Sequence, residues 1–257
     1  MECQYFDPKI HLLLCRSRKV TDWGKEQSFQ EPFWRFYWHR SKVVQISYKG
    51  KSFELGPGNF ALIAPETDFK GYGNTEFDEF YIHFQAGYPY DNCKPGIYIF
   101  PVDKGILTKI KVIHERLKSE ESKPSRSLSL LIHSICDEIL ALLPDNALPE
   151  NPQDIRISKT INYIHEHYSE KISNDLLAGI AAMNKNAFIR LFAQQSGITP
   201  QKMLELRRVN QACVLLRFSD FSIDEIAQRC GFPDRFYFSR VFKKLRSRGP
   251  AQFRKRL

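Results

Sequence analysis

The fold of the second half of this chain is decided by a repeated stretch. Residues 184–192 read NKNAFIRLF, and residues 234–242 read DRFYFSRVF. Both stretches contain Phe-x-Arg-x-Phe, displaced by 50 residues, and a proline follows eight residues after each. Upstream, a Leu-Ala pair at 177–178 recurs as Ile-Ala at 226–227, displaced by 49. An internal repeat of this kind predicts that one structural unit occurs twice.

Each copy has the spacing of a helix-turn-helix motif. In the first copy, the small residue Ala178, where two helices would touch, precedes the turn residue Ala182 by four positions. In the second copy, Ala227 precedes the turn residue Gly231 by the same four positions. A left-handed turn conformation is cheap for glycine and costs alanine about 1 kcal/mol, so the first turn is predicted to be the less favourable one. Asn184 and Asp234 stand where the second helices would need an N-cap.

The segment between the copies predicts a long helix. Residues 201–218 contain neither proline nor glycine. At about 1.5 Å per residue they would extend roughly 27 Å, which approaches the roughly 34 Å turn of B-DNA. One chain could then present two helices to adjacent major grooves.

The positive charge of the chain is confined to this half. Residues 1–153 hold 19 Lys or Arg against 20 Asp or Glu, whereas residues 154–257 hold 19 against 9. This asymmetry indicates a polyanionic partner for the second half only. Nucleic acid fits better than a membrane surface, because no basic helix with a wide apolar face accompanies the charge.

The first hundred residues predict strands. Short aromatic and β-branched runs alternate with turns such as 56–59, which is typical of a sandwich or barrel; the runs are 33–38, 43–48, 60–63 and 80–84. Apolar residues then recur every three to four positions, which predicts two amphipathic helices within 104–143. Three prolines within 144–152 mark a linker.

The expected fold is therefore α+β with two domains. Residues 1–145 would form a β-barrel (about 5–100) followed by two helices, residues 146–155 a linker, and residues 156–257 an all-α domain. The apolar stripe of the two helices, which includes Ile135 and Ile139, has two readings that do not exclude each other: packing on the chain's own barrel, and a seam between two chains.

The helical half resembles the DNA-binding domain of the AraC/XylS family of transcription regulators. The similarity lies in SIDEIAQRCGF at 222–232, YFSRVFKK at 237–244 and PAQFR at 250–254. The chain departs from the family pattern after Lys244, where Arg246 and Ser247 replace an aromatic residue and a glycine, and Gly249 precedes the proline. The resemblance implies two helix-turn-helix motifs joined by a long helix, acting on promoter DNA as an activator or repressor.

The same resemblance implies a set of DNA-binding residues. Their types suit base edges, since Arg reads guanine, Asn reads adenine, and Ile or Phe can meet a thymine methyl group. The first recognition helix would contribute Lys185, Asn186, Ile189 and Arg190, and the second Asp234, Arg235, Phe236, Ser239 and Arg240. Phosphate contacts would come from Lys243, Lys244, Arg246, Arg248, Arg254, Lys255 and Arg256.

The β-rich half is similar to the cupin-like sensor domain that is commonly fused to such a domain. The similar segments are LGPGN at 55–59, IAP at 63–65 and FYIHF at 80–84. Metal-using cupins usually have a histidine shortly after the proline, where this chain reads ETDF. We therefore expect neither a metal nor another cofactor, and no enzymatic activity.

Polar residues on two strands are candidates for binding a small polar effector such as a sugar. Period-two alternation puts Arg35, Tyr37 and His39 on one face of their strand, and Tyr81 and His83 on one face of theirs. Aromatic rings stack on sugar C–H faces while Arg, His and Tyr bind hydroxyl groups. The opposite faces are equally apolar, so the sequence does not tell which face lines the interior.

Six scattered cysteines and the absence of a leader or an apolar run of about 18 residues predict a cytoplasmic protein with reduced thiols. The expected partners are duplex DNA, a small-molecule effector, RNA polymerase and a second copy of the chain, with no membrane. Two alternatives differ in the role of the barrel. In one it only dimerises, and in the other, less favoured, it is a sugar-modifying enzyme of the cupin type.

Overall fold

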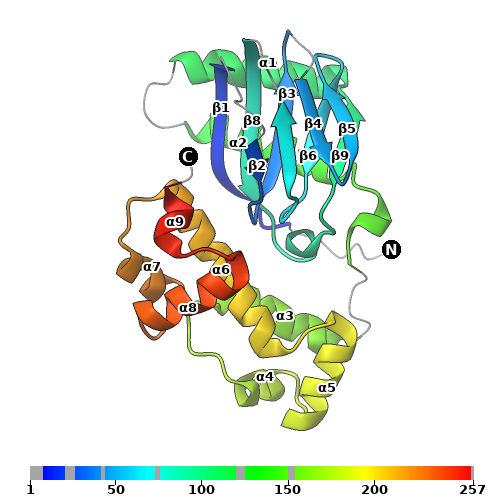
Figure 1. The fold of residues 1–257 in the computed structure, drawn as a ribbon. Helices are drawn as coiled ribbons and strands as arrows, with labels where there is room; N and C mark the ends of the chain where they lie inside the picture. The colour runs from blue at the N-terminus through cyan, green and yellow to red at the C-terminus, as the bar shows by residue number, and fades with distance from the viewer. Residues whose placement is uncertain are drawn as a thin grey trace, which may run out of the picture. The chain divides into compact units, whose positions relative to one another are not determined.

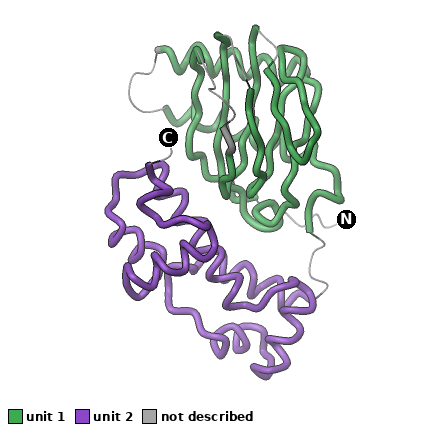
Figure 2. The backbone as a smooth tube through the Cα atoms, viewed as in Figure 1, with its two compact units in different colours: residues 1–149 green, residues 150–257 purple. Residues whose placement is uncertain are grey.

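A computed structural model describes residues 8–20, 27–41, 44–72, 76–119, 125–149 and 154–255. The chain divides into two compact units, residues 1–149 and 150–257 (Figure 2). The division lies inside the predicted linker, whose first part packs on the first unit: Ala147 is buried, and its carbonyl oxygen accepts a hydrogen bond from the Lys94 amide at 3.0 Å. Residues 150–153 of that linker, residues 5–7 of the predicted barrel and the predicted phosphate ligand Arg256 lie outside the described residues.

The β-rich unit contains two antiparallel sheets (Figure 1). The larger sheet has the order β1-β8-β3-β6-β9, and the smaller has the order β2-β7-β4-β5. The strands are β1 (His11–Val20), β2 (Gln27–Phe29), β3 (Trp34–His39), β4 (Val44–Tyr48), β5 (Lys51–Leu55), β6 (Asn59–Ile63), β7 (Phe69–Tyr72), β8 (Phe77–Gln85) and β9 (Ile97–Pro101). The predicted barrel is thus an open one: among the described strands, the hydrogen bonds form two sheets rather than one closed cylinder.

Two helices follow the strands, as predicted. They are α1 (Lys104–Ser119) and α2 (Arg126–Leu140), and short 3-10 turns occur at η1 (Tyr90–Asn92) and η2 (Asp145–Ala147). The Ser125 hydroxyl caps α2 by accepting a hydrogen bond from the Leu128 amide. Figure 1 shows both helices alongside the larger sheet.

The larger sheet is the middle of three layers, because each of its faces belongs to a different core. Trp34, Phe36 and Trp38 of β3 pack in one core with residues of α1 and α2. Tyr37 of the same strand packs in a second core with residues of the smaller sheet, including Phe69. Burying both faces explains why all six residues of β3 are buried.

The helical unit has the predicted order of elements. The helices are α3 (Ile155–His167), α4 (Asn174–Ile180), α5 (Lys185–Ser196), α6 (Pro200–Phe218), α7 (Ile223–Arg229), α8 (Arg235–Arg246) and α9 (Pro250–Arg254). The first helix-turn-helix copy is α4–α5, the second is α7–α8, and α6 joins them. Within the described residues, no helix is both long and apolar enough to cross a bilayer.

The repeat is visible in the packing as well as in the sequence. Phe188 and Phe192 of α5 are fully buried with ring centroids 5.6 Å apart and an interplanar angle of 66°. Their counterparts Phe238 and Phe242 of α8 are equally buried, at 5.5 Å and 70°. The two second helices are therefore anchored in the same way, and the predicted two-domain α+β architecture is confirmed.

Candidate nucleic-acid interface and effector site

The second helix of each copy presents a polar face to solvent. On α5, Lys185, Asn186 and Arg190 are exposed and Ile189 is partly exposed. On α8 and at its N-cap, the exposed residues are Asp234, Arg235, Phe236, Arg240, Lys243 and Lys244, and Ser239 is partly exposed. Phe236 is 78% exposed, which is unusual for a large aromatic ring and leaves it free to contact another molecule.

The two turns have matching backbone hydrogen bonds. The Met183 amide donates to the Ala178 carbonyl at 2.9 Å, and the Phe232 amide donates to the Ala227 carbonyl at 2.9 Å. The turn residue adopts a left-handed conformation in both copies, with φ of 50° at Ala182 and 76° at the glycine of the second turn. As predicted, the first turn therefore places an alanine in a left-handed conformation, whereas the second turn has a glycine there.

The caps are also as predicted, and they differ in strength. The Asn184 side chain accepts one hydrogen bond, from the Asn186 amide at 3.0 Å. The Asp234 carboxylate accepts two, from the amides of Phe236 and Tyr237, both at 2.8 Å. Because this carboxylate is engaged at the start of α8, the first role of Asp234 is to orient the recognition helix.

An ion pair recurs at equivalent positions of the two copies. Lys185 Nζ lies 2.8 Å from Asp175 Oδ2, and Arg235 Nη1 lies 3.1 Å from Asp224 Oδ2. In each copy, the first residue of the second helix is thereby tied to the first helix. Arg190, Arg240, Lys243 and Lys244 make no ion pair within the described residues.

The predicted phosphate contacts divide into two groups. Lys243, Lys244 and Lys255 are exposed. Three arginines instead contact their own domain: Arg246 Nη2 donates to Asn210 Oδ1 at 2.6 Å, Arg254 donates to the Phe221 carbonyl, and the Arg248 guanidinium lies 4.5 Å from the Phe253 ring centroid. The domain's own packing therefore occupies these three side chains.

The sequence interpretation missed two arginines of α6. Arg208 donates hydrogen bonds to the carbonyl oxygens of Tyr168 and Glu170, both at 2.7 Å. The neighbouring Arg207 guanidinium lies 5.3 Å from the Tyr168 ring centroid. The one available signal was two consecutive arginines within a helix that is otherwise rich in buried positions.

The five predicted effector residues lie on the side of the larger sheet that faces the smaller sheet. The register pairs Arg35 with His83, Tyr37 with Tyr81, and His39 with Glu79. The Tyr37 hydroxyl lies 3.3 Å from His83 Nε2, and the rings of Tyr37 and Tyr81 are 5.9 Å apart. The question that the sequence left open is answered: the polar face points between the sheets, and the opposite face packs on the helices.

Arg35 is the most unusual member of this set. It is 1% exposed, its Nη2 donates to the Thr67 carbonyl at 3.2 Å, and its guanidinium lies 4.6 Å from the Phe69 ring centroid. Its Nε has no hydrogen-bond partner among the described residues. Burial lowers the pKa of Arg35, and a buried guanidinium with an unused donor is costly unless something accepts from it.

The two histidines of this face are neutral at pH 7. Burial lowers the pKa of His39 to about 4. Burial, and then the charges of Arg35, Arg18 and Arg16, hold the pKa of His83 well below its usual value. A neutral imidazole can both donate and accept a hydrogen bond, which is the chemistry that a hydroxyl-bearing ligand requires.

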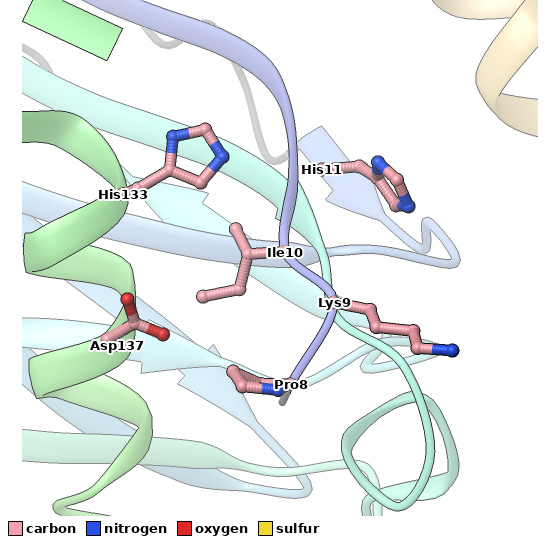
Figure 3. Close-up of a pocket in the computed structure, with 6 residues that line it drawn as sticks. All are labelled: Pro8, Lys9, Ile10, His11, His133 and Asp137. Carbon is pink, nitrogen blue, oxygen red and sulfur yellow. The ribbon is translucent and has the colours of Figure 1, made fainter. Parts of the chain in front are cut away.

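A pocket of about 440 Å³ lies elsewhere on this unit. In Figure 3, His133 and Asp137 of α2 face Ile10, whereas the side chains of Lys9 and His11 point away from the helix. None of the five predicted effector residues lines this pocket. His133 Nδ1 lies 2.8 Å from the Ser129 carbonyl oxygen, so one nitrogen of its ring already has a partner within α2.

The apolar stripe of α1 and α2 packs on the chain's own larger sheet. Ile135 and Ile139 are fully buried in the core that contains Trp34 and Phe36. They are therefore not available as a seam between chains. The large apolar residues exposed on and just after these helices are Val112 (44%), Leu130 (63%) and Leu142 (42%).

Comparisons with known proteins agree with this geometry. A family model described as a helix-turn-helix domain matches residues 177–256. The HTH-type transcriptional activator RhaS of Enterobacter sp. (strain 638) is 29% identical over 151 residues, covering 58% of this chain and 52% of RhaS. RhaS of Escherichia coli (strain K12 / DH10B) is 26% identical over 145 residues, covering 56% and 52%. These matches thus span about half the length of the curated relatives.

The whole chain is similar in fold to ToxT from Vibrio cholerae. One ToxT structure has a TM-score of 0.53 at 13% identity, covering 94% of this chain and 97% of ToxT. A ToxT structure with an unsaturated fatty acid bound has a TM-score of 0.54 at 12% identity, covering 98% and 97%. A β-rich unit followed by two helix-turn-helix copies on a connecting helix is a two-domain architecture whose second domain is of the helix-turn-helix class. The match over residues 177–256 and the similarity to RhaS support the resemblance to the AraC/XylS family that the sequence motifs indicated.

Proposed function

We propose that this protein is a sequence-specific, DNA-binding transcription regulator that inserts α5 and α8 into two adjacent major grooves. The observation that carries the proposal is the pair of equivalent recognition helices, each anchored by two buried phenylalanines and each with its polar face exposed. Residues 154–257 hold 19 Lys or Arg against 9 Asp or Glu, which suits a polyanion. The 19 residues of α6 extend about 28 Å between the copies, near one turn of the duplex.

The nine residues predicted on the recognition helices, and the phosphate contacts Lys243 and Lys244, have separate roles in this proposal. Arg190, Arg240 and Asn186 would read base edges, and Phe236 would meet a thymine methyl group. Lys243 and Lys244 would contact phosphate. Lys185 and Arg235 would exchange their aspartate partners for DNA. Ile189 and Ser239 would contact the groove at its edge, and Asp234 would orient α8.

The test is the binding of the full-length chain to duplexes that it enriches from a random-sequence library. We expect the logarithm of the binding constant to fall with the logarithm of salt concentration, with a slope several units negative. As the salt concentration rises, a nonspecific duplex should dissociate from the chain before an enriched duplex does. A flat salt titration, or no enriched sequence, would argue for a protein partner instead of DNA.

We further propose that the polar face between the two sheets binds a small polar effector such as a sugar. Support comes from the buried guanidinium of Arg35, the Tyr37–His83 contact and the two neutral imidazoles, which together offer donors, acceptors and ring faces. One structure of similar fold, that of ToxT, has an unsaturated fatty acid bound. The effector would favour one arrangement of the regulator through its higher affinity for that arrangement.

Thermal shift of the full-length chain against a panel of sugars tests the effector. A binding sugar should raise the melting temperature of the wild type and should fail to do so in Arg35→Met, which keeps the bulk of the side chain and removes its donors. The control is His133→Gln, which changes the separate pocket beside α2. If no small molecule shifts the wild type, the alternative in which the β-rich unit only dimerises is favoured.

We also propose a homodimer that acts as an activator through RNA polymerase. The exposed Leu130 and Val112 on the outer surface of α2 and α1 support a seam there. Leu130→Glu should then shift the sedimentation of the chain toward monomer. An unchanged dimer in a folded Leu130→Glu variant would assign the seam to another surface.

A further inference from the structure

A backbone contact joins the loop that leads into the first helix-turn-helix copy to the turn of the second copy. The loop between α3 and α4 lies against the turn between α7 and α8. A Cβ atom added at Gly231 would lie 2.5 Å from the Ser169 carbonyl oxygen and 2.8 Å from its carbonyl carbon. Both atoms are backbone, so no side-chain rotation could relieve the clash, and only glycine permits this approach.

Arg208 of α6 reinforces the same contact. Its Nε and Nη2 donate to the carbonyl oxygens of Tyr168 and Glu170, the two neighbours of Ser169, each at 2.7 Å. The guanidinium also lies 5.8 Å from the ring centroid of Phe232, the residue after Gly231. One charged side chain thus contacts both the loop that leads into the first copy and the turn of the second copy. Charge-assisted hydrogen bonds of this length are the stronger kind.

We infer that Arg208 and Gly231 are positioning residues that fix the orientation of one recognition helix relative to the other. The inference rests on the proposed DNA binding. The connecting helix sets the separation of the copies, and helices of both copies pack on it. The contact at 168–170 adds a second connection, made by backbone atoms and by the Arg208 guanidinium. A rigid pair of helices accepts DNA boxes at one spacing, because each inserted base pair moves a box by about 3.4 Å and about 35°.

The experiment measures how affinity depends on the spacing of the two boxes. Duplexes enriched by the full-length wild type supply the boxes, and one base pair is then inserted or removed between them. For the wild type, we expect affinity to fall at least about tenfold at the wrong spacing, since one helix loses its base contacts. For Arg208→Ala, the same change should cost no more than about threefold. Affinity for a duplex that contains a single box should stay within about twofold of the wild type.

Two further variants distinguish positioning from general destabilisation. Arg229→Ala is the matched control: it removes the same charge and an arginine–aromatic contact, at 3.9 Å from the ring centroid of Phe221, which lies just before α7 and away from residues 168–170 in the sequence. It should retain the spacing preference of the wild type. Arg208→Lys, which can still reach one carbonyl, should give an intermediate preference even if Arg208→Ala does not fold.

The outcomes separate this inference from the proposed function. If the wild type enriches boxes but Arg208→Ala and Arg208→Lys keep its full spacing preference, the positioning role is wrong and DNA binding stands. If the wild type enriches no sequence, the proposed DNA binding fails, and the inference fails with it.

Discussion

The two helix-turn-helix copies share an architecture but distribute their stability differently. Both anchor the second helix with two buried phenylalanines, and both tie its first residue to an aspartate. The second copy has a glycine in its turn, a two-bond N-cap at Asp234 and a capping box between Ser222 and Glu225. The first copy has Ala182 and a one-bond cap. The comparison indicates that the second copy is the more rigid reader, and the following experiments test it.

The largest expected difference concerns the turn residues. Gly231→Ala should lower the free energy of unfolding by about 3 kcal/mol, because it adds left-handed strain to a clash with the Ser169 backbone. The matched change Ala182→Gly should raise it by about 0.5 kcal/mol, as relief of strain exceeds the entropy of glycine. Urea unfolding followed by circular dichroism measures both. Equal and small changes in the free energy of unfolding would show that the contact between residue 231 and the Ser169 backbone tolerates a side chain.

The next test compares how much the two recognition helices contribute to DNA binding. Arg190→Ala and Arg240→Ala should each weaken specific binding by about 2 kcal/mol without changing thermal stability, since both side chains are exposed. Fluorescence anisotropy with an enriched duplex gives the affinities. Arg229→Ala controls for the lost charge. A loss in only one of the two variants would reveal that a single copy carries the sequence information.

A smaller difference is expected at the caps. Asp234→Ala should cost about 1.5 kcal/mol of stability and Asn184→Ala about 0.5 kcal/mol, because the first removes the acceptor of two backbone-amide hydrogen bonds and the second removes the acceptor of one. Asp234→Asn keeps a capping oxygen and is the control, again in urea unfolding. The ranking is contradicted if the alanine variant at 184 is the less stable of the two.

The smallest effects should come from the recurrent ion pairs. Asp175→Asn and Asp224→Asn should each change stability by less than about 0.5 kcal/mol, because all four partners are exposed. Both should strengthen DNA binding about two- to threefold, since a lysine or arginine is released and a negative charge is removed near the phosphates. Unaltered affinity in both variants would mean that these side chains do not approach DNA.

Sequence alone predicted the helical unit well because its signals are local. Ala178, Ala182 and Phe188 occupy positions that the motif itself dictates, and the repeat at Gly231 and Phe238 checks them independently. The polar faces of α5 and α8 follow from that framework. The roles of the individual exposed residues remain predictions, because an exposed side chain bears no mark of its partner.

The orientation of β3 could not be predicted, for a physical reason. All six of its residues are buried, so the contrast between polar and apolar faces that normally assigns a strand is missing. The assignment depends on the helices that cover Trp34 and Phe36, which lie far along the chain. The role of Arg208 was not predicted for a different reason: its hydrogen bonds go to backbone carbonyl oxygens, which every residue has, so the sequence does not mark its partners.

The two-sided burial of β3 has a mechanical consequence. The strand separates two cores: Tyr37 packs in the core between the sheets, and its neighbours Phe36 and Trp38 pack in the core beneath the helices. A molecule that displaces β3 from the side of Tyr37 would also move Phe36 and Trp38, because they share the same backbone, and would thereby shift their contacts with α1 and α2. Substitutions at neighbouring residues on opposite sides of this strand, such as Phe36 and Tyr37, should therefore combine non-additively, because they share one stretch of backbone.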